Sequence, residues 1–157
     1  MSIEKVRKYF QTFGIDGRIM EFDVSSATVE LAAQALGVEG ARIAKTLSYM
    51  VNDEAILVVA AGDVRVDNRK FKDAFHTKAK MLTPEQAVEL IGHAVGGVCP
   101  FGVNEGVKVY LDVSLKRFET VYPACGSSNS AIELSIAELE ETSDALGWVD
   151  LAKEAAE

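Results

Sequence analysis

Two apolar runs separated by a short polar turn constrain the fold of this chain more than any other feature. They cover residues 43–51 and 55–60, on either side of Asn52-Asp53-Glu54. Apolar runs of this length, joined by residues that favour turns, are typical of a β-hairpin. A hairpin of two antiparallel strands is therefore predicted in the first half of the chain.

The rest of the sequence alternates between helical and extended patterns. Ile3, Val6 and Phe10 recur at helical spacing, and Gly14 is typical of the residue that ends a helix. Further helices are predicted over residues 28–36 (N-cap Ser26, end Gly37), 68–75, 84–91 (capping box Thr83 to Gln86), and after a second capping box at Ser135. Strands are predicted over residues 18–24, 107–112, 119–122 and 131–134, and an amphipathic end after Trp148. Because short turns join several strands, the pattern favours an α+β fold with a mixed sheet.

Length and composition fit one globular domain, residues 1–157. Hydrophobic residues make up 48% and charged residues 25%. No stretch approaches the roughly 20 apolar residues that cross a bilayer, and the first residues lack the apolar stretch of a signal peptide. We therefore expect a cytoplasmic protein without membrane contact. The two cysteines and two histidines lack the spacing of a metal site, and a cytoplasmic chain of this size needs no disulfide.

Charge is unevenly distributed along the chain. The net charge of −8 argues against a protein that wraps nucleic acid non-specifically. Between Arg65 and Lys80, however, six basic residues stand against two acids, whereas eight acids stand against one base from Glu133 to the end. The basic segment is either a local surface for phosphates or an ordinary solvated helix face.

Lys45 is the one charged residue inside the first strand of the predicted hairpin. Alternation along a strand places it on the same face as Ile43 and Leu47. A lysine in that position either extends its amine to the edge of the sheet or points into a pocket. The pattern alone leaves both interpretations open.

Residues 92–106 contain five glycines and one proline, which predicts a loop with unusual backbone conformations. Within it, the sequence Gly-Gly-Val-Cys-Pro-Phe-Gly at 96–102 can bring backbone N–H groups to an anion or a developing oxyanion. The alternative is a tight connection between a helix and a strand. No motif places a base beside Cys99, so a nucleophilic role is not favoured, and His76 and His93 are expected at the surface or at helix ends.

A second glycine-containing turn covers residues 126–130, with the sequence Gly-Ser-Ser-Asn-Ser. Its hydroxyl and amide groups can hydrogen-bond a sugar or an amino group, but they are equally typical of a solvated turn. The sequence has no phosphate-loop, dinucleotide-binding or zinc-protease motif. The residues alone therefore predict an α+β domain with one pocket.

The order of these segments resembles the YbaK/prolyl-tRNA-synthetase-associated editing domain family. The first half of that family is similar to residues 28–38, 43–47 and 62–67 with Lys70. The second half is similar to residues 96–102, the strand ending at Asp112, Gly126 and residues 132–135. The resemblance spans roughly residues 3–140, and its strength lies in the common order of pieces that are individually weak.

This resemblance implies a mixed, curled, barrel-like sheet flanked by helices, and hydrolysis of the ester of misacylated tRNA by a separate protein acting in trans. Lys45 matches the functional lysine of the family, and Gly96 and Pro100 match its glycine-x-x-x-proline loop. The implied catalytic residues are Lys45, Gly96, Gly97, Val98, Cys99 and Pro100. The implied substrate contacts are Thr28, Phe101, Gly102, Gly126, Ser127 and Asn129, and the implied tRNA contacts are Arg69, Lys70 and Lys72. No metal or organic cofactor is implied.

The resemblance leaves the amino acid open among cysteine, alanine, serine and threonine, carried by a non-cognate tRNA such as tRNA-Pro. The expected partners are the acceptor end of tRNA and, as a further hypothesis, an aminoacyl-tRNA synthetase. Cys99 and His93 depart from the family, where serine and an aromatic residue are frequent. Two alternatives also stay open: an inactive synthetase- or tRNA-binding module of the same fold, and a hydrolase of other small esters.

Overall fold

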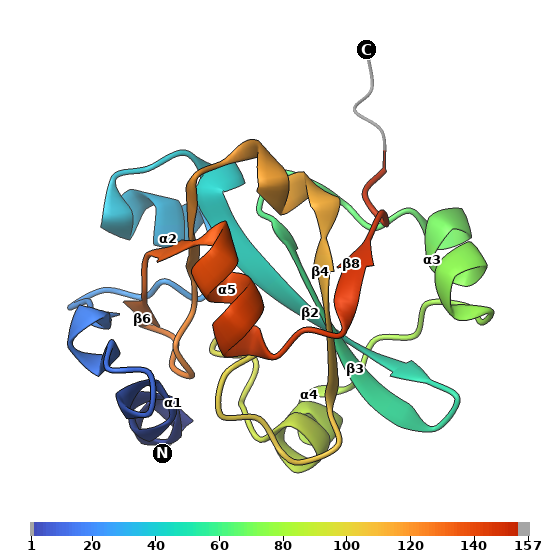
Figure 1. Cartoon of the computed structure of the whole chain (residues 1–157), viewed down its shortest axis with the longest axis horizontal. Coiled ribbons are helices and arrows are strands. Elements are labelled where there is room, and N and C mark those ends of the chain that lie inside the picture. Colours follow the sequence, from blue (N-terminus) through green and yellow to red (C-terminus); the bar gives the residue numbers. More distant parts are fainter. Residues whose placement is uncertain (1, 154–157) are drawn as a thin grey trace.

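A six-stranded mixed sheet forms the centre of the computed structural model, which describes residues 2–153 (Figure 1). The strand order is β7-β5-β2-β3-β4-β8. The strands are β2 (Ile43–Val51), β3 (Glu54–Ala61), β4 (Lys108–Asp112), β5 (Thr120–Pro123), β7 (Leu134–Ser135) and β8 (Gly147–Val149). Neighbours pair antiparallel in β2–β3 and β5–β7 and parallel in β2–β5, β3–β4 and β4–β8. The predicted α+β class with a mixed, curled sheet is confirmed.

The predicted hairpin is confirmed as β2 and β3. The two strands pair without interruption from Ala44 opposite Ala61 to Val51 opposite Glu54. The turn between them places Asn52 and Asp53 at positive φ, which asparagine and aspartate accept more readily than other side chains. The last six residues of β3 are all buried, because other elements cover both faces of the sheet at this strand.

Five helices surround the sheet in the described part of the chain: α1 (Ser2–Gln11), α2 (Val29–Leu36), α3 (Asn68–Phe75), α4 (Pro84–Gln86) and α5 (Ile136–Ser143). Both predicted capping boxes are present, and α4 continues as a π-helical turn over Ala87–Ile91. The N-cap of α2 was predicted wrongly as Ser26. Thr28 caps the helix by accepting a hydrogen bond from the Leu31 N–H, whereas Ser26 is buried and donates to the Ser128 carbonyl.

Two predicted strands differ from the structure. The strand predicted over 18–24 contains only β1 (Met20–Glu21), preceded by a 3-10 turn, and the strand predicted over 131–134 divides into β6 (Ser130–Ala131) and β7. β1 and β6 form a separate two-stranded sheet. Trp148 lies in β8, opposite Leu111 of β4. After it, Leu151 is buried whereas Asp150 and Lys153 are exposed, which agrees with the predicted amphipathic end up to residue 153; residues 154–157 lie outside the described residues.

Two hydrophobic cores lie on the two sides of the sheet. The larger one joins Phe10 of α1 and Phe101 to Leu57 and Val59 of β3. The smaller one packs Phe71 of α3 against Tyr49 of β2 and against β3. The strands of the hairpin therefore separate α1 from α3, which lie in different parts of the fold in Figure 1.

The start of β2 and the end of β3 approach a neighbouring turn so closely that only glycine fits at residue 62. A Cβ atom on Gly62 would lie 2.1 Å from the Gly40 carbonyl oxygen and 2.9 Å from a Val29 methyl group. We expect Gly62→Ala to lower the free energy of unfolding by about 1–3 kcal/mol, as other overpacked sites do. The matched control is Gly17→Ala, where a Cβ meets nothing within 4 Å. In urea unfolding, equal stability of the two variants would contradict this account.

Candidate active site

The edge of β2 that faces away from β3 pairs with two separate segments, one at each end of the strand. β5 pairs with β2 at Ile43 and Ala44. Further along, Met81 bridges to Tyr49, with main-chain hydrogen bonds between residues 80–82 and β2. Within residues 2–153, the stretch of this edge between them, residues 45–47, has no strand partner. The sheet therefore has a gap at this point.

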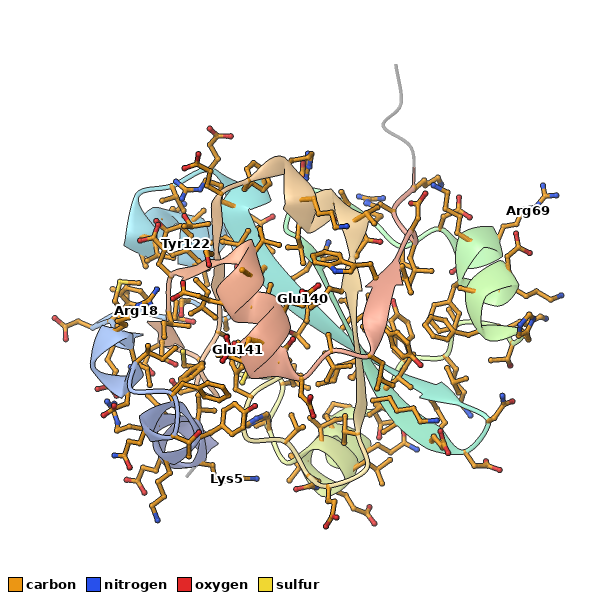
Figure 2. The ribbon with its side chains drawn as sticks, viewed as in Figure 1. Lys5, Arg18, Arg69, Tyr122, Glu140 and Glu141 are labelled. Atoms are coloured by element: carbon orange, nitrogen blue, oxygen red, sulfur yellow. The ribbon has the colours of Figure 1, made fainter. Side chains whose placement is uncertain are left out.

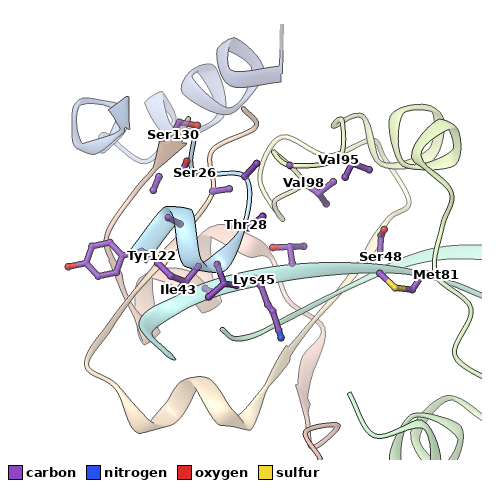
Figure 3. Close-up of a pocket in the computed structure, with 18 of the residues that line it drawn as sticks. Ser26, Thr28, Ile43, Lys45, Ser48, Met81, Val95, Val98, Tyr122 and Ser130 are labelled. Atoms are coloured by element: carbon purple, nitrogen blue, oxygen red, sulfur yellow. The ribbon is translucent and has the colours of Figure 1, made fainter. Parts of the chain in front are cut away.

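A cavity of about 210 Å³ lies at this gap (Figure 3). Its walls come from β2, the start of α2, residues 81–82, the loop at 95–98, and β5 with the turn that follows it. The wall residues are mainly small, aliphatic or hydroxyl-bearing, and they include no aspartate or glutamate. The full set is Ser26, Ala27, Thr28, Val29, Ala32, Ile43, Ala44, Lys45, Thr46, Ser48, Met81, Leu82, Val95, Gly96, Val98, Tyr122, Ala124, Ser130 and Ala131.

Four of the predicted site residues line this cavity: Thr28, Lys45, Gly96 and Val98. They come from three segments that are distant in the sequence. The other predicted catalytic and substrate-binding residues lie behind the wall or beside it. Several wall residues are not singled out from the sequence, in particular Thr46, Met81 and Tyr122, whereas Ser130 belongs to the predicted turn at 126–130. The alternation of Ala44, Thr46 and Ser48 along β2 was the local signal that could have indicated a small, polar wall.

Lys45 lies at the edge of the cavity and is half-buried. Its ammonium group donates a hydrogen bond to the Val64 carbonyl, and in Figure 3 its side chain leaves β2 on the side opposite to Val95 and Val98. Burial lowers the pKa of Lys45, and nearby Asp63 partly opposes this effect. The side chain thus lines the cavity, as one interpretation of the sequence predicts, whereas its amine bonds to the segment that follows β3 and not to an open edge of the sheet.

The glycines of the 96–102 loop allow a close approach to the second predicted turn. A Cβ on Gly97 would lie 2.7 Å from the Gly126 carbonyl carbon and from the Ser127 nitrogen, so the two backbones touch. Gly96 has a φ of +96°, in the left-handed region that favours glycine. The Gly97 N–H donates to the Ala94 carbonyl. Among the described residues, the N–H groups of Gly96 and Val98 have no such partner.

The second half of this loop, residues 99–102, is packed into the protein interior, behind the segment at 95–98 that lines the cavity. Cys99 and Phe101 have no exposed surface, and the Phe101 ring packs 4.6 Å from the Phe10 ring between centroids. Pro100 is buried as well, and Gly102 lies against the backbone of α1 with a φ of +60°. The side chains of Cys99 and Phe101, predicted as catalytic and substrate-binding, therefore support the loop from below and do not face the cavity.

His93 is fully buried, so the surface alternative of its prediction is wrong, but it directly follows Gly92, the C-cap of the π-helical turn, so the helix-end alternative is confirmed. Its Nε2 lies 2.7 Å from the Phe101 carbonyl oxygen and 3.6 Å from Cys99 Sγ. Burial lowers the pKa of His93, and Nδ1 has no hydrogen-bond partner among the described residues. Because a carbonyl oxygen only accepts, Nε2 carries the proton and cannot take one from Cys99. Burial also raises the pKa of Cys99 to about 12, which opposes a nucleophilic role.

Hydrogen bonds of its own side chains stabilise the turn at residues 126–130. The Ser127 hydroxyl bonds with the Ser130 hydroxyl and donates to Asn129 Oδ1. The Asn129 side-chain amide donates to the Phe22 carbonyl. Gly126, Ser127 and Asn129, predicted as substrate contacts, do not line the cavity; they hold the wall that Ser130 contributes.

The predicted tRNA contacts lie on α3, and only part of the set is free. Lys70 donates to Asp150 and to the Ala152 carbonyl, whereas Arg69 and Lys72 are exposed. Arg69, Lys72 and Lys78 line a second, open cavity of about 420 Å³. Figure 2 shows Arg69 at the end of the molecule opposite to Tyr122, a wall residue of the first cavity.

Comparison with known proteins identifies the family. A model of the aminoacyl-tRNA editing domain matches residues 24–142, which include every segment that lines the first cavity. The chain belongs to this family. Among the described residues, no helix of this editing domain is long and apolar enough to cross a membrane.

Several relatives cover the editing domain to different extents. The uncharacterized protein YwhH of Bacillus subtilis is 52% identical over 98% of this chain and 99% of its own length. A proline–tRNA ligase of Halalkalibacterium halodurans is 33% identical over 66% of this chain but only 18% of the ligase. A solved structure described as a candidate trans-editing enzyme for prolyl tRNA synthetase has a TM-score of 0.88 and 30% identity, covering 98% of both chains. The hypothetical protein APE2540 has a TM-score of 0.84 and 29% identity, covering 95% of this chain and 99% of its own.

Burial predicts that both thiols of the editing domain are unreactive in the native state. Cys99 and Cys125 are free and buried, and burial raises the pKa of each. With a pKa of about 12 for Cys99, on the order of 10⁻⁴ of this thiol is ionised at pH 8. We expect a thiol reagent to label neither cysteine of the native protein within minutes, and to label both after unfolding in guanidinium. Rapid native labelling of Cys99, located by mass spectrometry, would contradict the burial described above.

Proposed function

We propose that this editing domain is a hydrolase that deacylates misacylated tRNA as a separate protein. The observation that carries the proposal is the cavity at the gap in the β2 edge, where a backbone loop with unpaired N–H groups faces small wall residues. An aminoacyl ester needs such a place for its amino acid and for the carbonyl carbon that water attacks. The family match and the candidate trans-editing structure support this assignment.

In the proposed reaction, water attacks the ester carbonyl and the carbonyl oxygen gains negative charge. The N–H groups of Gly96 and Val98 are the available donors for that oxygen, and fixed backbone donors stabilise such charge without reorganising. Lys45 has two further N–H donors besides the one bound to Val64, which suit a phosphate or the ribose side of the substrate. The neighbouring ribose hydroxyl of the substrate is proposed to position the water, as the family resemblance suggests. No covalent intermediate on Cys99 is involved.

The cavity has to hold the amino acid together with its ester group, which leaves room for a small side chain. Ala27, Ala44, Val98 and Ala131 contribute to its wall, and its volume is about 210 Å³. Cysteine, alanine, serine and threonine are therefore the proposed side chains, on a non-cognate tRNA such as tRNA-Pro. The similarity to proline–tRNA ligases supports that choice of tRNA. A cytoplasmic location and a synthetase partner are further parts of this proposal.

The proposed tRNA contacts lie far from the cavity along the molecule. Arg69 and Lys72 can reach a ligand in the first cavity only if that ligand is long, and a tRNA acceptor stem meets this requirement. Lys70 has a structural role through Asp150 and Ala152 and is a weaker candidate. An inactive tRNA-binding module would keep this surface but would show association without turnover.

The first test of the proposed function is the removal of the Lys45 amine. We expect Lys45→Ala to lower kcat/KM for deacylation about 10- to 100-fold, because a hydrogen bond to a charged group such as a phosphate contributes about 1.5–3 kcal/mol. The control is Lys116→Ala, because Lys116 lies over the Trp148 ring and outside the cavity. Rates are measured on cysteinyl-, alanyl-, seryl- and threonyl-tRNA. If the unmodified protein leaves all four esters intact, the proposed function is wrong.

The second test concerns the salt dependence of tRNA binding. For each phosphate that a protein no longer neutralises, the slope of log K against log salt becomes shallower by about 0.7–0.9. We expect the double variant Arg69→Ala/Lys72→Ala to bind tRNA more weakly and with a slope shallower by about 1.5. Lys8→Ala/Lys116→Ala removes the same charge from other exposed positions and serves as the control. Equal slopes for the two double variants would show that α3 does not contact the phosphates.

A further inference from the structure

Two hydroxyl groups in the cavity wall, those of Thr46 and Ser48, have no hydrogen-bond partner in the part of the chain that the structure describes. Of the two, Thr46 Oγ1 is the one that is fully buried. The remaining wall hydroxyls are engaged: Thr28 Oγ1 caps α2, Ser26 and Tyr122 donate to Ser128 and Glu133, and the Ser130 hydroxyl bonds with Ser127. Buried polar groups are nearly always paired, so an unpaired one at a cavity points to a partner that a ligand supplies.

The position of Thr46 supports this interpretation. It lies in the stretch of the β2 edge that has no strand partner within residues 2–153. Ala44, Thr46 and Ser48 alternate on one face of β2, and all three line the cavity. Thr46 lines the cavity although its Oγ1 has almost no exposed surface, so a rotation about the Cα–Cβ bond, between staggered rotamers, is what brings the hydroxyl to a ligand.

The charges around the cavity decide which group of an aminoacyl ester meets Thr46. The wall residues include no carboxylate, and the charged residue among them, Lys45, leaves β2 on the side opposite to Val95 and Val98 and hence, by alternation, opposite to Thr46. A cationic α-ammonium group beside Thr46 would therefore lose water without gaining an anion as its partner. A neutral hydroxyl can both donate to and accept from the threonine hydroxyl.

We propose that the Thr46 hydroxyl binds the side-chain hydroxyl of the esterified amino acid, so that the site selects seryl over alanyl esters. This inference rests on the proposed function. A serine side chain pairs with Thr46, whereas alanine leaves the Thr46 hydroxyl buried and unpaired. Sites built to hydrogen-bond a substrate hydroxyl discriminate against the analogue that lacks it for this reason.

The test compares seryl and alanyl esters on the same tRNA with the unmodified protein, Thr46→Val and Thr46→Ser. Thr46→Val keeps the shape of the side chain and removes the hydroxyl, whereas Thr46→Ser keeps the hydroxyl. We expect kcat/KM for the seryl ester to exceed that for the alanyl ester by about tenfold or more in the unmodified protein. This ratio should fall toward one in Thr46→Val and persist in Thr46→Ser. Because both rates come from one protein sample, a smaller folded fraction cancels from the ratio.

The outcomes separate this inference from the proposed function. If the unmodified protein cleaves both esters equally well, or if Thr46→Val slows both by the same factor, selection by Thr46 is wrong and deacylation stands. Loss of the ratio in Thr46→Ser as well as in Thr46→Val would also overturn the inference, because the hydroxyl would then not be its source. If the unmodified protein cleaves neither of these esters nor those of cysteine and threonine, the proposed function itself fails.

Discussion

The pairing of β2 with β3 over eight consecutive residues holds both cores and the candidate site in place. This pairing occupies one edge of β2, and other elements cover β3 on both faces of the sheet. The other edge of β2 is divided between β5 at one end and residues 80–82 at the other. The gap between these partners leaves room for the cavity, so the strand that organises the core also carries Lys45 and Thr46 into the wall.

Opposite the gap, the site depends on backbone rather than on reactive side chains. Gly97 lets its loop touch the backbone at Gly126, and Gly96 adopts a positive φ beside the cavity. The side chains that follow, Cys99 and Phe101, are buried supports. An ester whose carbonyl oxygen is held by N–H groups and whose amino acid fills a small cavity suits such an arrangement, because hydrolysis then needs donors and a positioned water more than a protein nucleophile.

Local patterns allowed much of the fold to be predicted from the sequence. The hairpin, α3 and both capping boxes depend on neighbouring residues, and all of these predictions are confirmed. The parts that could not be predicted depend on long-range contacts. β8 forms because its residues pair with β4, with Trp148 opposite Leu111, and the buried His93 lies with its Nε2 against the Phe101 carbonyl. For the same reason Lys45 and the glycine loop were candidates from the sequence, whereas the cavity wall around Thr46, built from five segments, was not.

The central claim is that the amino acid of the substrate occupies the gap in the β2 edge. A crystal structure with adenosine carrying a non-hydrolysable, amide-linked serine on its ribose tests this claim most directly. The account predicts the seryl group in the cavity, its hydroxyl within hydrogen-bond distance of Thr46 Oγ1 and its carbonyl oxygen facing the N–H groups of Gly96 and Val98. A bound analogue whose seryl group lies outside this cavity would contradict the account.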